Sequence, residues 1–203
     1  MGRTSDARER LLDSALELIS SRSYNDVGVQ ELCQHSGVKK GSFYHFFESK
    51  RELVLAVLDR RAEEYRADLQ ALFSRSIPPL EKIASLFDSA CENSRQCKSQ
   101  RGLMVGCCFG NLAVEMSTLD ETIRARLEEI FEERVGFIQK ALEEAMELGH
   151  LPRGDANILA RSVMAFLQGA TAIAKTRNEP ELIGRMAQAV MDLFRGCQSR
   201  LKG

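Results

Sequence analysis

Helical periodicity constrains this chain more than any other feature of its sequence. In residues 6–21, Leu11, Leu12, Ala15, Leu18 and Ile19 recur at the spacing of one helix face. No stretch alternates apolar and polar residues as a half-buried β-strand would. We therefore predict an all-α fold, with helices over residues 6–21, 29–36, from about 39, 49–73, 79–96, 103–117, 120–148, 154–177 and 180–201.

Capping chemistry and helix-breaking residues set the predicted boundaries. Asp6 with Glu9, and Ser49 with Glu52, have the spacing of a capping box at a helix start. Gly37 follows the second helix and supplies the turn before the third. Prolines and further glycines separate the later helices.

Composition narrows the possible functions. The chain has 203 residues, 44% hydrophobic and 28% charged, so it can bury a sizeable core in one or two domains. Its net charge of -1 argues against a bulk polyelectrolyte partner, so any nucleic-acid contact must be focal. Six cysteines without a Cys-x-x-Cys pair are expected to be mostly reduced, and we expect neither a metal site nor a cofactor.

The start of the sequence lacks the apolar core of a signal peptide. No apolar run reaches the roughly 18 residues that a membrane helix needs. We therefore expect a cytoplasmic protein without a membrane partner.

The stretch "VKKGSFYHFFESK", residues 38–50, combines aromatic and basic side chains on one short helix. At 100° per residue, Phe43, Phe46 and Phe47 fall in one arc and are expected to face inward. The opposite side is small, polar or hydroxyl-bearing, and lysines stand at the helix N-terminus, where backbone N–H groups favour phosphate. This outward set comprises Lys39, Lys40, Gly41, Ser42, Tyr44 and His45.

Two short helices joined by "HSGV" predict a helix-turn-helix whose second helix enters the DNA major groove. The alternative is that "SFYHFF" is only the core of a small three-helix domain with solvated lysines. That alternative explains the phenylalanines, but it does not explain a shared polar face on so short a helix. DNA binding is therefore favoured.

The segment "GVQELCQHSGVKKGSFYHFFESKRELVLAVL" resembles the DNA-binding signature of the TetR family of transcriptional repressors. The resemblance implies an all-helical homodimer that binds double-stranded operator DNA and a small-molecule effector. It also implies a helix-turn-helix domain over residues 1–50 and a larger effector-binding and dimerisation domain over residues 51–203. The helix at 49–73 would link the two.

The same resemblance assigns site residues. Lys39, Lys40, Gly41, Ser42, Tyr44 and His45 would face bases and phosphates, with Lys50 holding a further phosphate. Two departures from the family pattern stand out. Many relatives have Ser or Thr where this chain has Gly28 and Val29, so Val29 offers only its backbone N–H, and many have His or Tyr at Phe46.

The stretch "GLMVGCCFGNLAVEM" contains Gly102, Gly106 and Gly110 at four-residue intervals, which we interpret as one side of a helix. Interior glycine costs about 0.8–1.0 kcal/mol relative to alanine, so either another backbone approaches closely or the space receives a ligand. Gly102 has the alternative role of a helix cap.

Cys107 and Cys108 lie beside these glycines, and two interpretations are open. Free cysteine is commonly a small buried hydrophobe. Alternatively, a nearby helix end lowers the pKa of Cys107 and makes it a reactive thiol. "GCCFGNLAVEMSTLDETIRARLEEIF" is similar to electrophile-responsive TetR-family members, whose sensing thiol maps onto Cys107. The expected effector or redox segment is Gly106, Cys107, Cys108, Phe109 and Gly110.

The last two predicted helices mix small and large apolar residues over wide faces, which suggests a two-fold interface between subunits. An ordinary core hairpin is the alternative. The resemblance favours a four-helix dimer bundle, with contacts at Ala160, Met164, Gln168, Met186 and Val190.

These observations predict a homodimeric repressor that a small-molecule effector, in a cavity among residues 79–177, or thiol modification releases from its operator. No nucleophile motif or phosphate loop supports an enzyme, so we expect none. A helical protein–protein adaptor without DNA binding is the alternative. The effector, the operator sequence, the regulated genes and any activating role are not encoded in recognisable form.

Overall fold

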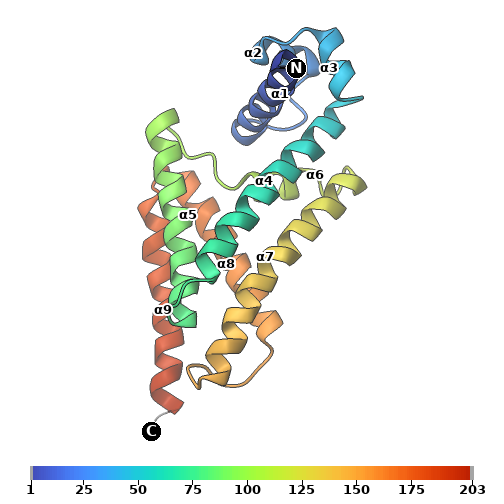
Figure 1. Cartoon of the computed structure of the whole chain (residues 1–203). Coiled ribbons are helices and arrows are strands. Elements are labelled where there is room, and N and C mark those ends of the chain that lie inside the picture. The colour runs from blue at the N-terminus through green and yellow to red at the C-terminus, as the bar shows by residue number, and fades with distance from the viewer. Residues whose placement is uncertain (1, 202–203) are drawn as a thin grey trace. The chain divides into compact units, whose positions relative to one another are not determined.

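A computed structural model describes the backbone of residues 2–201 and the side chains of residues 6–194. Within these residues every regular element is a helix, as predicted (Figure 1). The helices are α1 (Gly2–Ser21), α2 (Val29–Ser36), α3 (Lys40–Phe46), α4 (Lys50–Phe73), α5 (Pro79–Arg101), α6 (Cys108–Met116), α7 (Glu121–Glu147), α8 (Ala156–Arg177) and α9 (Glu181–Leu201).

The chain forms two compact units. The first contains the residues up to Tyr65 together with Cys107–Glu129, and the second contains Arg66–Gly106 and the residues from Ile130 onward. These units describe packing, so the predicted functional division between residues 50 and 51 stays a prediction.

In the first unit, α1 packs against α2, α3 and α6. Figure 1 shows α1, α2 and α3 gathered near the first turns of α4. Its core contains Leu11, Leu32, Phe43, Leu53 and Phe109, all fully buried. The Ser49 hydroxyl accepts the Glu52 N–H at 3.2 Å, which confirms the predicted cap of α4, although the Glu52 carboxylate turns to the N–H of Glu48 at 2.5 Å.

In the second unit, α5 and α8 both pack against α9, and Figure 1 shows α5 and α9 running side by side. Asn178 ends α8 in the left-handed conformation, with φ of 51°. Its Oδ1 accepts the Met104 N–H, and its Nδ2 donates to the Gly102 carbonyl, both at 3.0 Å. One side chain thus fixes the segment that leaves α5.

Three predicted helix limits are wrong. The helix predicted over residues 79–96 continues as α5 to Arg101. The first helix begins at Gly2, so Asp6 is not its cap and instead pairs with Arg10 at 3.5 Å. The predicted helix at 103–117 shrinks to α6. Gly102 caps α5 at φ 76° and Gly106 has φ 80°, conformations that break a right-handed helix. The proposed stripe of Gly102, Gly106 and Gly110 on one helix therefore does not exist.

None of the helices in the described residues combines the length and apolar character needed to cross a membrane.

Candidate DNA-binding surface and thiol segment

The turn between α2 and α3 is fixed by backbone chemistry. Gly28 precedes α2 without a side-chain cap, as its sequence implied. At the other end Gly37 adopts φ 65°, and its N–H donates to the Gln34 carbonyl at 3.3 Å while the Val38 N–H donates to that of Cys33 at 3.0 Å. Glycine adopts this left-handed conformation without strain. The turn that it forms sets the direction in which the chain enters α3.

The inward side of α3 is narrower than predicted. Phe43 is 0% exposed and Phe47 3% exposed, but Phe47 lies just beyond the helix in extended conformation. Phe46 is only half-buried and meets the His45 ring edge-on, with ring centroids 5.1 Å apart. The prediction of three buried phenylalanines therefore holds for Phe43 and Phe47 but not for Phe46.

The outward side of α3 is open. Tyr44 is 51% exposed and rests edge-on against Phe43, with ring centroids 5.2 Å apart. No hydrogen bond or ion pair engages these outward side chains within the part of the chain that the structure describes. The exposed set is Lys39, Lys40, Gly41, Ser42, Tyr44 and His45. Their donors and acceptors are available to a ligand.

Lys50 differs from the other predicted contacts because it is half-buried. Its ammonium donates to the carbonyls of Tyr24 at 2.9 Å and Val27 at 3.0 Å, and it lies 3.9 Å from the centroid of the Tyr24 ring. Burial lowers the pKa of Lys50, while Glu115 raises it in part. Two of its three N–H groups thus hold the loop of residues 22–28, and the phosphate contact stays a prediction.

Glu115 of α6 holds the other side of this 22–28 loop. Its carboxylate accepts the N–H of Tyr24 at 2.9 Å, the N–H of Asn25 at 3.1 Å and the hydroxyl of Ser23. Burial raises the Glu115 pKa, but these hydrogen bonds and the Lys50 charge lower it by more. No sequence pattern predicts this contact, because the partners lie 90 to 92 residues apart.

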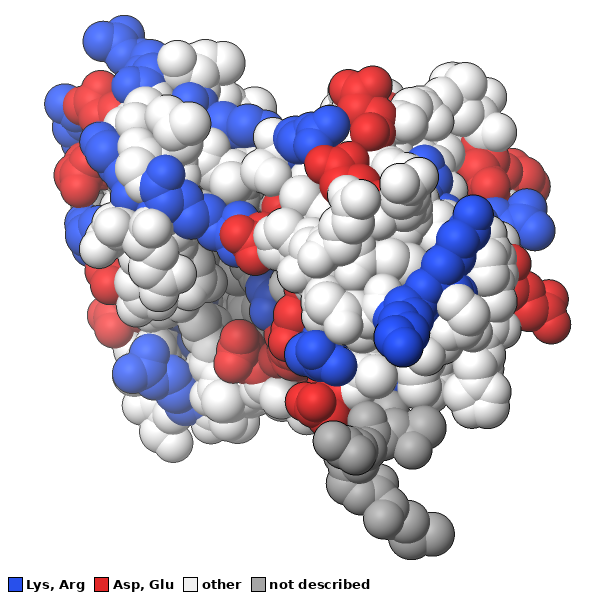
Figure 2. Space-filling model, turned by 90° about the horizontal axis from the view of Figure 1, so that it is seen from above, with Lys and Arg blue, Asp and Glu red and all other residues white. Residues whose placement is uncertain are grey.

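Surface charge is mixed rather than uniform. Figure 2 shows lysines and arginines standing among aspartates and glutamates, with uncharged areas between them. This agrees with the net charge of -1. Any DNA contact must therefore depend on a few individual side chains rather than on a large positively charged surface.

The two adjacent cysteines sit at the start of α6. Cys107 is the residue that caps the helix and Cys108 is its first residue, and both are half-buried. Burial raises the pKa of Cys108, an ionised Cys107 raises it further, and the Arg61 guanidinium opposes both. Cys108 is therefore a poor nucleophile at neutral pH. Phe109 is fully buried against Tyr65, with ring centroids 6.0 Å apart, so it serves the core.

Two of the predicted dimer contacts, Ala160 and Met164, are buried within the single chain, with 0% and 5% exposure. Their place in a dimer interface stays a prediction. Gln168, Met186 and Val190 are half-buried and stay predictions. The exposed side of α8 carries smaller residues instead: Ser162, Ala165, Gly169 and Ala172, with Ile158 at one end.

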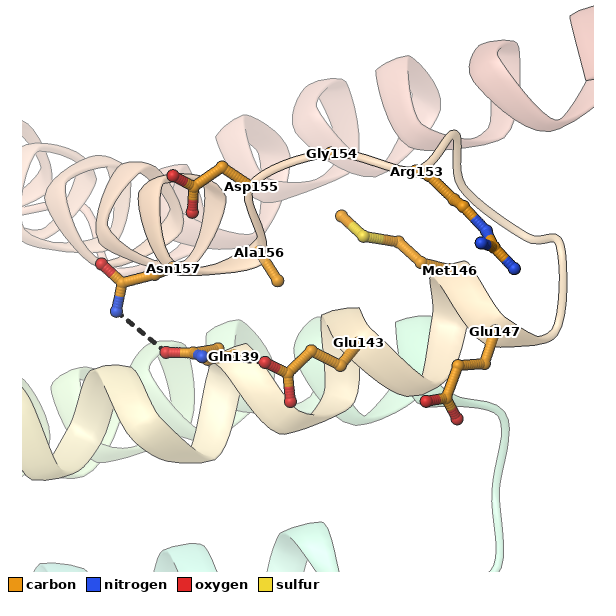
Figure 3. Close-up of a pocket in the computed structure, with 9 residues that line it drawn as sticks. All are labelled: Gln139, Glu143, Met146, Glu147, Arg153, Gly154, Asp155, Ala156 and Asn157. Atoms are coloured by element: carbon orange, nitrogen blue, oxygen red, sulfur yellow. Dashed lines mark hydrogen bonds between the residues drawn. The ribbon is translucent and has the colours of Figure 1, made fainter.

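A cavity of about 550 Å³ opens between α7 and the start of α8 (Figure 3). The Asn157 amide donates to the Gln139 carbonyl oxygen at 2.9 Å across it. Figure 3 shows Met146 directed into the space beneath the 153–156 segment, whereas the Glu143 and Glu147 carboxylates point away from that segment. The described residues hold no group of acidic, histidine or cysteine side chains suited to a metal ion.

Family profiles match most of the chain. The one described as "Bacterial regulatory proteins, tetR family" matches residues 11–57, and "Tetracyclin repressor-like, C-terminal domain" matches residues 79–190. The chain belongs to the TetR family. This TetR-family protein is 31% identical over 198 residues to the HTH-type transcriptional repressor DhaR of Mycobacterium sp. (strain GP1), covering 95% of this chain and 93% of DhaR.

Other TetR-family proteins are also similar to this chain in sequence and fold. The HTH-type transcriptional repressor NemR of Escherichia coli K12 is 29% identical over 143 residues, covering 70% of each chain. The crystal structure of E. coli NemR in its reduced form matches with a TM-score of 0.78 at 28% identity, covering 92% of this chain and 97% of that one. A TetR-family regulator from Agrobacterium tumefaciens shares the fold, with a TM-score of 0.84 at 22% identity, covering 94% and 98%. The protein is therefore a DNA-binding transcriptional regulator, like its relatives, which are not enzymes.

Proposed function

We propose that this TetR-family protein is a homodimeric repressor that reads operator DNA with α3 and leaves it when an effector binds or a thiol is modified. The observation that carries the proposal is the open polar side of α3 on a helix fixed by Phe43. A helical adaptor without DNA binding gains no support from the relatives, which are regulators.

Gly41 supplies the most specific support for DNA contact. Its φ is not positive, and a Cβ built on it would meet no atom within 4 Å in the chain. Neither backbone strain nor internal packing therefore requires glycine here, although glycine weakens a helix by roughly 0.5–1 kcal/mol. Close approach of the α3 backbone to DNA explains the missing side chain.

The remaining residues divide by role. Lys39 and Lys40, at the start of α3, suit phosphate oxygens, while Ser42, Tyr44 and His45 suit base edges or the sugar–phosphate backbone. Two copies of α3 in one dimer would enter major grooves on one side of a palindromic site, about 34–36 Å apart or at a related spacing.

Substitution at Gly41 tests this proposal sharply. Gly41→Ala should stabilise the free protein by about 0.4–1 kcal/mol, because alanine restricts the unfolded chain. The same change should weaken binding to the intergenic DNA beside its gene, measured by fluorescence anisotropy. Thr118→Ala, at an exposed position outside α3, is the control. Undiminished operator affinity in Gly41→Ala would remove the close-approach argument.

Side-chain variants separate the contact types. Tyr44→Ala should abolish sequence preference without loss of helicity. Lys40→Gln should weaken binding to all sequences and reduce the salt slope by about 1. Retention of the same fragment at moderate ionic strength by Tyr44→Ala would contradict the assignment of α3.

The dimer is proposed through the exposed small-residue side of α8. A Cβ at Gly169 would also meet no atom within 4 Å, so another backbone approaching from outside accounts for this helical glycine. Gly169→Glu should yield monomers in sedimentation velocity, while Ser99→Glu, which adds the same charge to exposed α5, should not. A dimeric Gly169→Glu protein would place the interface elsewhere.

Thiol release is proposed through Cys107. The crystal structure of the related repressor NemR is of its reduced form, and this likeness supports a thiol-dependent state for the present protein. Cys107 caps α6, so it stands at the positive end of a helix dipole. N-ethylmaleimide should release the wild-type protein from DNA but not Cys107→Ser. Equal release of both would remove the thiol sensor and leave the repressor intact.

A further inference from the structure

A second cavity of the Arg66–Gly106 and post-Ile130 unit has chemistry that selects a ligand class. It has a volume of about 350 Å³ and lies where the end of α4, the first turns of α5 and the second half of α7 meet. We name it the Phe73–Phe137 cavity. Its lining residues are Gln70, Phe73, Ser74, Lys82, Phe137, Lys140, Ala141 and Glu144.

Its apolar wall consists of two phenylalanines. The rings of Phe73 and Phe137 have centroids 5.8 Å apart and planes inclined by 43°. Both side chains are only half-buried, so part of each ring is left to line the cavity. A flat aromatic or unsaturated group would cover this surface with favourable ring–ring geometry.

Its polar wall is positively charged. The Lys82 side chain is only 12% exposed, and its ammonium lies 3.1 Å from the Glu144 carboxylate, which occupies one of its three N–H groups. Lys140 stands one turn before Glu144 on α7 and is exposed. The lining therefore carries two ammonium groups and one carboxylate. A single negative charge on the ligand would balance the set, and a cation would be repelled.

We propose that the Phe73–Phe137 cavity binds a small aromatic carboxylate, with its ring against the two phenylalanines and its carboxylate toward Lys82 and Lys140. The proposal rests on the effector-released repressor above and gives that effector a chemical class. Gln70 and Ser74 line the same cavity and add neutral polar groups.

The cavity of Figure 3 does not favour an anionic ligand. Its lining carries three carboxylates, on Glu143, Glu147 and Asp155, against the single guanidinium of Arg153. Asp155 already accepts the Ile158 N–H that begins α8, at 3.0 Å. An anion is therefore disfavoured in that cavity, and the negative groups already have structural partners or point outward.

Calorimetric titration of the full chain with phenylacetate and phenylacetamide tests the proposal. The two probes share a ring and a shape, and only the first is charged. Phenylacetate should bind saturably at one site per chain, and phenylacetamide about fivefold more weakly or worse, the factor expected for a partly exposed charge pair. Equal binding of the two, or no binding of phenylacetate up to its solubility limit, would overturn the proposal.

Variants locate the binding. Lys140→Gln should weaken phenylacetate about fivefold and leave phenylacetamide unchanged, whereas Phe137→Leu should weaken both. Arg177→Gln removes the same charge from an exposed position outside the cavity and should change neither. Unchanged phenylacetate affinity in both Lys140→Gln and Phe137→Leu would place binding elsewhere.

Operator binding is measured separately on the same samples. Failure to bind DNA without ligand would refute the proposed repressor, while the calorimetry would still decide the cavity. If DNA binds, phenylacetate should lower operator affinity. Saturated binding that leaves operator affinity unchanged would overturn the effector role.

Discussion

Removing the Glu115 carboxylate should loosen the 22–28 loop that leads into α2. In Glu115→Ala the N–H groups of Tyr24 and Asn25 lose an ionised acceptor at 2.9 and 3.1 Å. Hydrogen bonds to a charged group contribute about 1.5–3 kcal/mol each, but water replaces part of this at an exposed residue such as Asn25. We therefore expect a total loss of about 2 kcal/mol in local stability.

Amide hydrogen exchange measures this loss directly. A decrease of about 2 kcal/mol in the free energy of local opening makes the Tyr24 and Asn25 amides exchange roughly thirtyfold faster. Val114→Ala is the matched control, because the neighbouring Val114 side chain is 91% exposed. Operator affinity should fall in Glu115→Ala as well. Wild-type exchange rates in Glu115→Ala would refute the argument that this carboxylate holds the loop.

The stability that Glu115 gives to the 22–28 loop should decrease in acid. The Glu115 pKa is lower in the folded protein than its usual value, so the ionised form binds the loop more tightly. The stabilisation is complete above the usual glutamate pKa of about 4.3 and is lost as the pH falls through the lower folded value. Amide hydrogen exchange at Tyr24 and Asn25, corrected for the intrinsic effect of pH on the exchange rate, should therefore accelerate in acid in the wild type but not in Glu115→Gln. An identical acid profile for both proteins would contradict this linkage.

Three further changes have expected outcomes. Gly106→Ala should destabilise the protein by about 1–2 kcal/mol in urea unfolding because of its φ of 80°, and Gly154→Ala, without positive φ, should not; equal midpoints would contradict this. In peptide mapping after iodoacetamide, Cys108 should stay largely unmodified at neutral pH and react only in strong base, since its pKa is raised; faster labelling of Cys108 than of Cys107 would reverse their assignment. Lys50→Met should lower thermal stability by about 1–2 kcal/mol through loss of two loop hydrogen bonds, and a melting curve like that of the wild type would restore a purely DNA-facing role.

Local chemistry was predictable where one backbone conformation or one cap decides it. The left-handed turn at Gly37 and the hydroxyl cap at Ser49 both stand where the sequence indicates them. Gly102 and Gly106 show the opposite case. A four-residue interval looks helical, but two positive φ angles place these glycines outside any helix, and spacing alone does not reveal φ.

Tertiary contacts explain the other differences. Ala160 and Met164 look like interface residues by type, yet the chain's own helices cover them. Lys50 matches a family pattern for phosphate contact, but the carbonyls that it binds belong to a loop more than 20 residues earlier in the chain. Neither outcome follows from periodicity, because each depends on which distant segment packs nearby.

If α3 binds operator DNA as proposed, Gly41 sets thermostability against gene control at a single position. Directed evolution that screens only for resistance to heat would accept a methyl group there, because nothing in the folded monomer resists it. The selected variants would be more thermostable but would no longer bind the operator. Engineering of this protein as a biosensor therefore requires Gly41 to be kept while other positions are stabilised.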